Sequence, residues 1–315
     1  MRKILALVVA LCLAPIGAQA WWQSVAQQSV SVAATYQGPG DIVSGALIWG
    51  SCSRVYNVSL ASTSTSLCDL VDTSVGGTAI CTLRGSSTGF VDLTGSYCTG
   101  SATPAVACAA AAGGACRVSK VYDQIGGTSG WVNATHGQRP VFTFSAQNSL
   151  PGLTGTAAAN TFLNTSSTFT QAQPWTLVAV GKRTANFTTS QSLIGSSGSL
   201  NDCLSYTTSA STAGFTSDGA STITLGSVTD SNFHAVQGVA ATSPNGVLAV
   251  DGVETTGNVG TGAFSANTSR IMRCAGGLSL DGVWLEGGLW PVGFDATQRG
   301  NINSNIHSST SGYNF

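Results

Sequence analysis

The chain has 315 residues, of which 43% are hydrophobic and only 8% are charged, and its formal net charge is −1 at pH 7. This apolar content excludes an intrinsically disordered chain, because enough apolar side chains are present to form a core. The small net charge and the lack of a basic stripe argue against nucleic acid as a partner.

Residues 1–20 have the pattern of a secretory signal peptide. Arg2 and Lys3 form a basic start, an apolar run follows, and Ala18–Ala20 is an A-x-A cleavage site. The apolar run is too short to span a bilayer, and no later run reaches the ~18 apolar residues that a transmembrane helix needs. We therefore expect cleavage before Trp21 and a secreted protein, periplasmic or extracellular, without a stable membrane span.

The mature chain is expected to form one domain. Residues 21–37 form a predicted N-terminal extension, with a short helix over 21–36, and residues 38–315 form a predicted β-sandwich domain. About 295 mature residues suffice for one large sandwich or two small domains. We favour one domain because no Pro-rich or charged linker divides the chain.

Eight cysteines remain once Cys12 leaves with the leader. In an oxidising compartment, an even set of cysteines predicts disulfides. Zinc is the alternative, but there is no C-x-x-C pair and the histidines do not lie at finger spacing, so no metal site is expected. The pairing of Cys52, Cys68, Cys81 and Cys98 has three solutions and stays open, with nearest-neighbour pairing as one of them.

Short β-rich runs separated by turn residues recur along the chain, and helical periodicity is nearly absent. Cys68–Asp72 and Thr78–Cys81 form a predicted hairpin. Later strands are predicted over Trp175–Gly181, Phe233–Val239, Gly246–Val250 and Gly282–Trp290, and Asp251–Gly252 is a tight-turn dipeptide. This rhythm predicts an all-β sandwich of antiparallel sheets. Asp295 is expected to cap a short C-terminal helix through Ile306, with Gln298 completing a capping box.

Three stretches resemble a known family in their order and spacing. Gly38–Ile42 reads G-P-G-D-I, the small loop Cys108–Cys116 runs into Tyr122–Gln124 (Y-D-Q), and Leu285–Gly288 reads L-E-G-G. They resemble the G-P-C-D-I opening, the small cysteine loop with its Y-D-Q strand end, and the Y-E-G strand of the arabinofuranosidase B catalytic domain. Related patterns occur in bacterial domains of the concanavalin A-like, laminin-G type. The resemblance implies a jelly-roll sandwich of two sheets and a Cys108–Cys116 disulfide.

The family that the chain resembles consists of retaining glycosidases, which need two carboxylates about 5 Å apart. In that family, the nucleophile is a Glu and the acid/base is an Asp. The nucleophile's strand, M-E-A-I-Y-L, is matched best by residues 202–206, and this match places Cys203 at the nucleophile. The segment that carries the acid/base, G-G-D-N, is matched by residues 273–277. Two alignments of this segment are possible, and they put Ala275 or Leu278 at the acid/base position. The resemblance therefore implies that neither position carries a carboxylate.

We accordingly expect a Cys203–Cys274 disulfide close to a lost active-site cleft, and a protein that binds a polysaccharide or glycan without hydrolysing it. The first alternative is an active α-L-arabinofuranosidase with Asp202 as nucleophile and Asp281 as acid/base, although Asp202 alternates to the sheet face opposite Cys203. A structural cell-surface or phage-derived adhesion module is the second. Glu286 matches the Y-E-G glutamate, which is not catalytic in the family, so a structural or substrate-contact role is expected. Glu286 is otherwise a third fallback candidate for catalysis, beside Asp202 and Asp281.

A binding module needs exposed aromatic rings that stack on sugars, with polar groups that fix the orientation. The candidate rings are Trp131, Trp175, Tyr206, Trp284 and Trp290. Trp131 is favoured because a Gly-rich loop would bury a core ring poorly. Asn133, His136 and Arg139 follow in the same region and are expected to supply hydrogen bonds to the sugar.

Two further expectations concern the second half of the chain. Trp284 and Trp290 lie on one run, so a regular strand places them on the same face, most simply in the core. No cofactor is expected. Calcium bound at Asp218–Gly219 or Asp230–Asn232 is the alternative to plain turn chemistry in those two loops.

Overall fold

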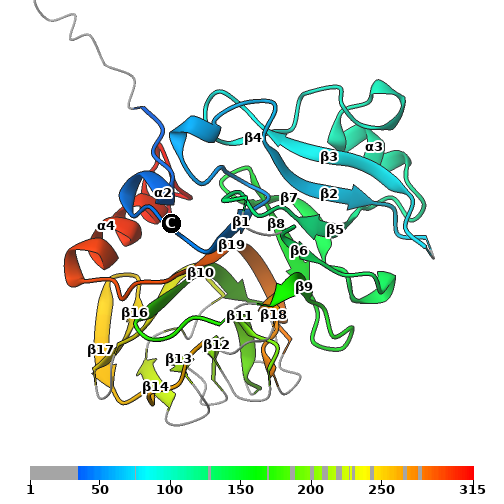
Figure 1. Ribbon diagram of the computed structural model, residues 1–315. Helices are drawn as coiled ribbons and strands as arrows, with labels where there is room; N and C mark the ends of the chain where they lie inside the picture. The colour runs from blue at the N-terminus through cyan, green and yellow to red at the C-terminus, as the bar shows by residue number, and fades with distance from the viewer. Residues whose placement is uncertain are drawn as a thin grey trace, which may run out of the picture. The chain divides into compact units, whose positions relative to one another are not determined.

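Antiparallel strands make up most of the regular secondary structure of the described residues in this computed structural model (Figure 1). It describes residues 35–315 except for 75, 127–128, 169, 185–188, 199–201, 208–211, 218–221, 227, 229–230, 242–244, 265–267 and 276–278. The predicted leader and nearly all of the predicted extension lie outside these residues. Tyr36–Phe315 form one unit, and Tyr36 packs its ring on Phe90. Within the described part of the chain, no helix is long and apolar enough to cross a membrane.

One sheet is built around two nine-residue strands, β10 and β19. It runs in the order β17 (Val253–Gly257), β16 (Gly246–Val250), β15 (His234–Ala240), β10 (Trp175–Arg183) and β19 (Gly282–Trp290). Beyond β19, the strand β8 (Leu150–Gly155) pairs with its first half and β1 (Ile48–Ser51) with its second half.

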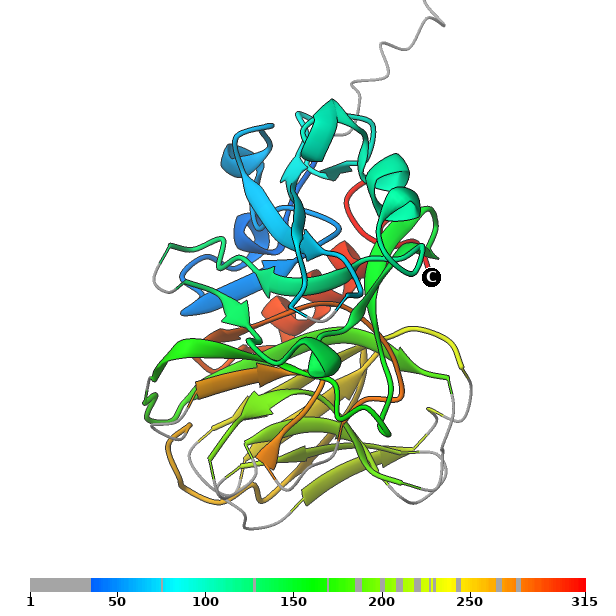
Figure 2. The same ribbon diagram turned by 90° about the vertical axis from the view of Figure 1, so that its right-hand side faces the viewer.

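The second sheet faces the first across the main core. It runs in the order β14 (Thr222–Gly226), β13 (Thr212–Thr216), β12 (Cys203–Tyr206), β11 (Gln191–Ser196), β18 (Thr268–Ile271), β9 (Leu163–Thr168), β6 (Trp131–Val132) and β5 (Arg117–Val121). The ladder continues from β5 into β2 (Ser66–Val71), β3 (Ala79–Gly85) and β4 (Val91–Asp92), while β7 (Val141–Gln147) joins β5 to β8. Figure 2 shows the layered strands below the cyan β2–β3 hairpin.

Side-chain alternation along β10 produces two apolar clusters. Leu177 and Ala179 point between the sheets and join the main core. Val178 and Val180 point to the other face, into a second cluster that includes Ile302 and Ile306 of α4 (Ala296–His307). A strand that is covered on both faces is apolar throughout, which explains why β10 shows no alternation of polar residues.

Three helices accompany the strands within the described residues, and the last of them begins as the sequence predicts. They are α2 (Pro39–Ile42), α3 (Pro104–Ala110) and α4, with 3-10 turns η1 (Val58–Leu60), η2 (Thr99–Ser101) and η3 (His136–Gln138). The Asp295 carboxylate accepts a hydrogen bond from the Gln298 N–H at 2.8 Å, and the Gln298 side chain accepts one from the Asp295 N–H at 3.0 Å. The predicted two-sheet sandwich with a short C-terminal helix is therefore confirmed.

A β-bulge in β19 separates its two tryptophans. Neighbouring residues of β10, Val180 and Gly181, pair with residues of β19 that are two apart, so Leu285 is an extra residue. The extra residue reverses the alternation. Trp284 consequently lies in the main core, and Trp290 lies in the cluster beneath α4. The expectation that they share a face is wrong because the strand is not regular, whereas both rings are buried as expected.

Four disulfides join the eight cysteines of the described chain two by two, in the order in which they occur in the sequence. The pairs are Cys52–Cys68, Cys81–Cys98, Cys108–Cys116 and Cys203–Cys274. The first three lie in or beside the β2–β3 hairpin and α3, and the fourth lies in the second sheet. Nearest-neighbour pairing is thus the solution among the three that the sequence left open.

Candidate functional site

The Cys203–Cys274 disulfide crosses a neighbouring strand, β11. Cys203 opens β12, Cys274 follows β18, and β11 pairs with both of these strands. Gly195 of β11 lies beneath the bond, since a Cβ there would come within 2.6 Å of the Cys274 sulfur. The glycine therefore leaves the space that the disulfide occupies. Both cysteines are buried, with 7% and 2% of their surface exposed.

The two aspartates of the hydrolase alternative lie beside opposite ends of β11. Asp202 is buried, and its carbonyl oxygen accepts a hydrogen bond from the N–H of Ser196, the last residue of β11, at 2.8 Å. Asp281 donates its N–H to the side chain of Gln191, the first residue of β11, at 2.9 Å. The strand therefore holds them apart along its length.

Glu286 forms a fully buried ion pair with Arg54. Arg54 Nη2 lies 2.5 Å from Oε1 and Nε lies 2.6 Å from Oε2, and neither side chain is exposed. The Tyr313 hydroxyl donates to the same carboxylate at 2.9 Å, and Arg54 Nη1 donates to Asn305 at 2.8 Å. Burial alone would lower the pKa of Arg54, but the charge and hydrogen bonds of Glu286 raise it above its usual value. Glu286 has no exposed surface for a substrate to contact, which argues against the substrate-contact role and supports a structural one.

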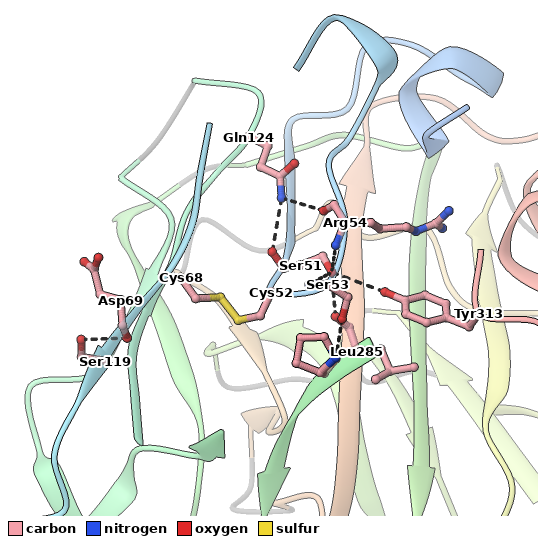
Figure 3. Close-up of a disulfide and its surroundings, with 11 residues drawn as sticks. Ser51, Cys52, Ser53, Arg54, Cys68, Asp69, Ser119, Gln124, Leu285 and Tyr313 are labelled. Carbon is pink, nitrogen blue, oxygen red and sulfur yellow. Dashed lines mark hydrogen bonds between the residues drawn. A yellow bond between two sulfur atoms is a disulfide. The ribbon is translucent and has the colours of Figure 1, made fainter. Parts of the chain in front are cut away.

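The Y-D-Q motif holds the chain segment that carries Arg54. Gln124 accepts a hydrogen bond from the Tyr56 N–H at 2.7 Å. Its amide donates to the carbonyl oxygens of Ser51 and Arg54 at 3.3 and 3.2 Å (Figure 3). The Ser51 hydroxyl donates to the Leu285 carbonyl oxygen at 3.0 Å, beside Glu286 in β19. Gln124 of the Y-D-Q motif and Glu286 of the L-E-G-G motif therefore both contact the segment that carries Arg54, one through hydrogen bonds to its backbone and the other through the buried ion pair.

The ring of Trp131 lies in the core. Trp131 opens β6, has no exposed surface, and donates its indole N–H to Ser269 Oγ at 3.2 Å. The ring packs over Gly50 of β1, where a Cβ would come within 2.6 Å of it. A ring without exposed surface cannot stack on a sugar, so the prediction for Trp131 is wrong.

The same correction applies to the other predicted aromatic platforms. Tyr206 is 1% exposed, and its hydroxyl donates to the Gly181 carbonyl oxygen at 2.7 Å. The Arg183 guanidinium covers its ring at 5.0 Å from the centroid. The indoles of Trp175, Trp284 and Trp290 are fully buried as well.

The polar side chains that follow Trp131 bind the backbone rather than a groove. Arg139 Nε donates to the Asn133 carbonyl oxygen at 2.7 Å. The side-chain amide of Asn133 donates to the Phe162 carbonyl oxygen at 2.9 Å. His136 Nε2 lies 2.9 Å from the Thr73 carbonyl oxygen. These contacts fix the loop before β7 and support a structural role for Asn133, His136 and Arg139. Of the residues considered for calcium, Asp218, Gly219 and Asp230 lie outside the described residues.

His234, Asp251 and His307 form a cluster that was not predicted from the sequence. Asp251 Oδ2 lies 2.6 Å from His234 Nδ1, Oδ1 lies 3.5 Å from His307 Nε2, and Oδ1 also accepts the Ala235 N–H at 2.8 Å. Burial alone would raise the pKa of Asp251, but these hydrogen bonds hold it well below its usual range, so the carboxylate is charged. All three side chains line a cavity of about 530 Å³. The D-G dipeptide predicted the turn at Asp251, but nothing local predicted its histidine partners.

The His307–Asp251 contact predicts a contribution to stability that depends on pH. The hydrogen bond to Asp251 raises the pKa of His307, against the opposing effect of burial. The stabilisation is therefore fully present below the unfolded-state pKa of about 6.5 and is lost as pH rises through the higher folded-state pKa. We therefore expect His307→Gln to lower the free energy of unfolding by less at about pH 9 than at about pH 6. Urea unfolding at each pH measures this difference. In an Asp251→Asn background this slope should be lost or change sign, because burial then outweighs the hydrogen bond to Asn303. A slope of the same sign and size there would contradict this cause.

Comparison with known proteins gives a likeness in structure and none in sequence. No family model and no curated protein matches the chain. An arabinofuranosidase complexed with arabinofuranosyl-α-1,2-xylobiose is similar with a TM-score of 0.55 at 13% identity. A GH54 α-L-arabinofuranosidase soaked with a cyclic sulfate inhibitor is similar with a TM-score of 0.52 at 14% identity. Each comparison covers 85% of this chain and 64% of the other, so this chain spans less than two thirds of their length. The protein therefore has a β-sandwich fold similar to that of these glycoside hydrolases.

Proposed function

We propose that the protein is a secreted glycan-binding module with a degenerate glycosidase active site. The observation that carries this proposal is the Cys203–Cys274 disulfide, because Cys203 stands where the resemblance puts the nucleophile. A retaining glycosidase attacks the sugar with a carboxylate and protonates the leaving group with a second carboxyl group. A disulfide sulfur is neither an ionised nucleophile nor a proton donor, so neither step has its group here. Four disulfides are consistent with export to an oxidising compartment.

The positions of Asp202 and Asp281 support the same proposal. Their contacts with Ser196 and Gln191 lie at the two ends of β11. Five residue steps along a strand, at about 3.3 Å each, separate these contacts by roughly 16 Å. A retaining enzyme needs its carboxyl groups about 5 Å apart and an inverting enzyme about 6.5–9.5 Å apart. The spacing of these backbone contacts therefore argues against an Asp202–Asp281 pair in either mechanism.

We expect the mature protein to bind saccharides and to release no 4-nitrophenol from 4-nitrophenyl α-L-arabinofuranoside above the buffer rate. Binding is measured by isothermal titration calorimetry against arabinoxylan oligosaccharides, L-arabinose, D-xylose and D-galactose. Turnover that is abolished by Asp202→Asn or Asp281→Asn would establish the arabinofuranosidase instead. Turnover that survives both changes reports a contaminating enzyme. Neither binding nor turnover would favour the structural or adhesion module.

A further inference from the structure

The cavity beside Asp251 is separate from the disulfide that marks the lost catalytic position. Lys182 near the end of β10, Phe233 just before β15 and His307 at the end of α4 contribute to its wall. Phe233 belongs to the apolar cluster on the α4 side of the first sheet, whereas the disulfide lies in the second sheet. A ligand in this cavity therefore needs nothing from the strands that carry Cys203 and Cys274.

The cavity wall presents hydrogen-bond donors and acceptors together. The Asp251 carboxylate only accepts hydrogen bonds, the Lys182 ammonium only donates them, and the amides of Gln147 and Asn232 do both. A ligand that satisfies all of them must donate and accept at several adjacent positions, as the hydroxyl groups of a sugar do. Asp251 and Lys182 carry opposite charges that offset each other, so this pair gives a ligand with charge of one sign no net attraction.

Two phenylalanines supply an apolar part of the wall. The ring centroids of Phe233 and Phe315 lie 6.1 Å apart, and Phe315 also packs on His307 at 4.6 Å. Phe233 is 4% exposed, and the Lys182 ammonium lies 4.5 Å from its centroid. Phe315 is only partly buried, so it has surface on which the apolar face of a sugar ring can stack.

The polar groups are held in position before a ligand arrives. Asp251 has a φ of 50° in the β16–β17 turn, and its carboxylate is fixed by the Ala235 N–H and by His234. His307 Nδ1 lies 2.8 Å from the Asn303 carbonyl oxygen, which orients the ring. Groups that are already ordered lose little rotamer freedom on binding, so the entropic cost of taking up a ligand is low.

Two other cavities bounded by described residues are less suited to a sugar. Among the described residues that line the cavity of about 330 Å³ beside β2 and β3, the Asp69 carboxylate is accompanied by no Lys, Arg or His, so this wall offers no cationic hydrogen-bond donor. The cavity of about 260 Å³ beside α3 is lined mostly by small and apolar side chains. The 530 Å³ cavity also lies within the usual range of small-molecule sites, about 300–1,000 Å³.

We propose that the Asp251 cavity is the glycan site of this protein and takes a neutral sugar residue. Phe315 stacks on the apolar face of the sugar, while Asp251, Lys182 and the two amides bind its hydroxyl groups. This assignment depends on the glycan-binding function proposed above, and it adds the place and the charge class of the ligand.

Calorimetric titration of matched variants tests the site. The probe is the saccharide, from the four named above, that binds the wild type most tightly. Asp251→Asn keeps a residue that tolerates positive φ, and Phe315→Ala removes the stacking ring. We expect each change to weaken binding by about tenfold or more. Asp69→Asn, in the β2–β3 cavity, is the control and should change affinity by less than about twofold. Lys182→Met is a further variant, and thermal unfolding checks that every variant is folded.

The outcomes separate the site from the function. If the wild type binds and the Asp251, Phe315 and Lys182 variants retain full affinity, the site is wrong while the glycan-binding function stands. If Asp69→Asn loses binding instead, the β2–β3 cavity is the site. If D-glucuronate, added to the panel, binds more tightly than every neutral sugar, the neutral class is wrong. If no saccharide binds the wild type, the proposed function fails and the site fails with it.

Discussion

Replacing Glu286 with glutamine is expected to destabilise the protein by about 3–5 kcal/mol. The change keeps the shape of the side chain but removes the charge that offsets Arg54, which has no exposed surface. An uncompensated buried guanidinium is costly because it has lost its water and gains too little from neutral partners. The measurement is the free energy of unfolding in guanidinium chloride at neutral pH.

Glu254→Gln is the matched control for the buried pair. Glu254 forms an ion pair with Arg299 at 2.6 Å, but its side chain is 33% exposed. Solvent screens such a pair, so we expect a loss below about 1 kcal/mol. The Arg54→Met/Glu286→Met double variant should lose about 1–3 kcal/mol less unfolding free energy than the two single variants lose together. In the double variant, neither side chain remains as an unpaired buried charge. Equal losses for Glu286→Gln and Glu254→Gln would show that burial of the pair does not matter.

Removal of the Cys203–Cys274 disulfide by paired alanine substitutions is expected to cost about 4 kcal/mol in unfolding free energy. The bond closes a loop with a sequence separation of 71, which restricts the unfolded chain strongly. The bond also fills the space above Gly195, so its removal leaves the second sheet less well packed there. Denaturant unfolding of the oxidised proteins measures the difference.

The Cys108–Cys116 pair is the internal comparison for loop length. Its sequence separation is 8, and the chain-entropy relation gives about 2–3 kcal/mol for its removal. A larger loss for the short loop than for the long one would contradict the chain-entropy explanation. Saccharide affinity of the folded Cys203→Ala/Cys274→Ala variant should stay close to that of the wild type, because the proposed glycan site lies on the other sheet.

Features set by neighbouring residues could be predicted from the sequence. The Asp251–Gly252 turn and the Asp295–Gln298 capping box follow from residue types a few positions apart, and both are present. The continuous apolar run of β10 predicted a strand, and the even count of cysteines predicted disulfides. The two-sheet class followed from the spacing of these strands.

Features set by distant residues could not be predicted in this way. Trp131 follows Gly130 in a Gly-rich segment, yet its ring is buried because Gly50 of another strand leaves room for it. The Arg54–Glu286 pair joins residues 232 positions apart, and neither position has a local signal for a buried charge. The bulge at Leu285 depends on how β19 pairs with β10, which a single run of letters does not specify.

The connectivity of the disulfides bears on how the protein is made. Because the cysteines of the described chain pair two by two in sequence order, no disulfide loop encloses or overlaps another. In the export that we propose, an oxidase that joins thiols in the order in which they emerge would therefore produce all four native pairs directly. Overlapping pairs would require the slow exchange of thiols between mixed disulfides before the native set is reached. The secretion that we propose therefore requires an oxidase but little isomerase for this chain to mature.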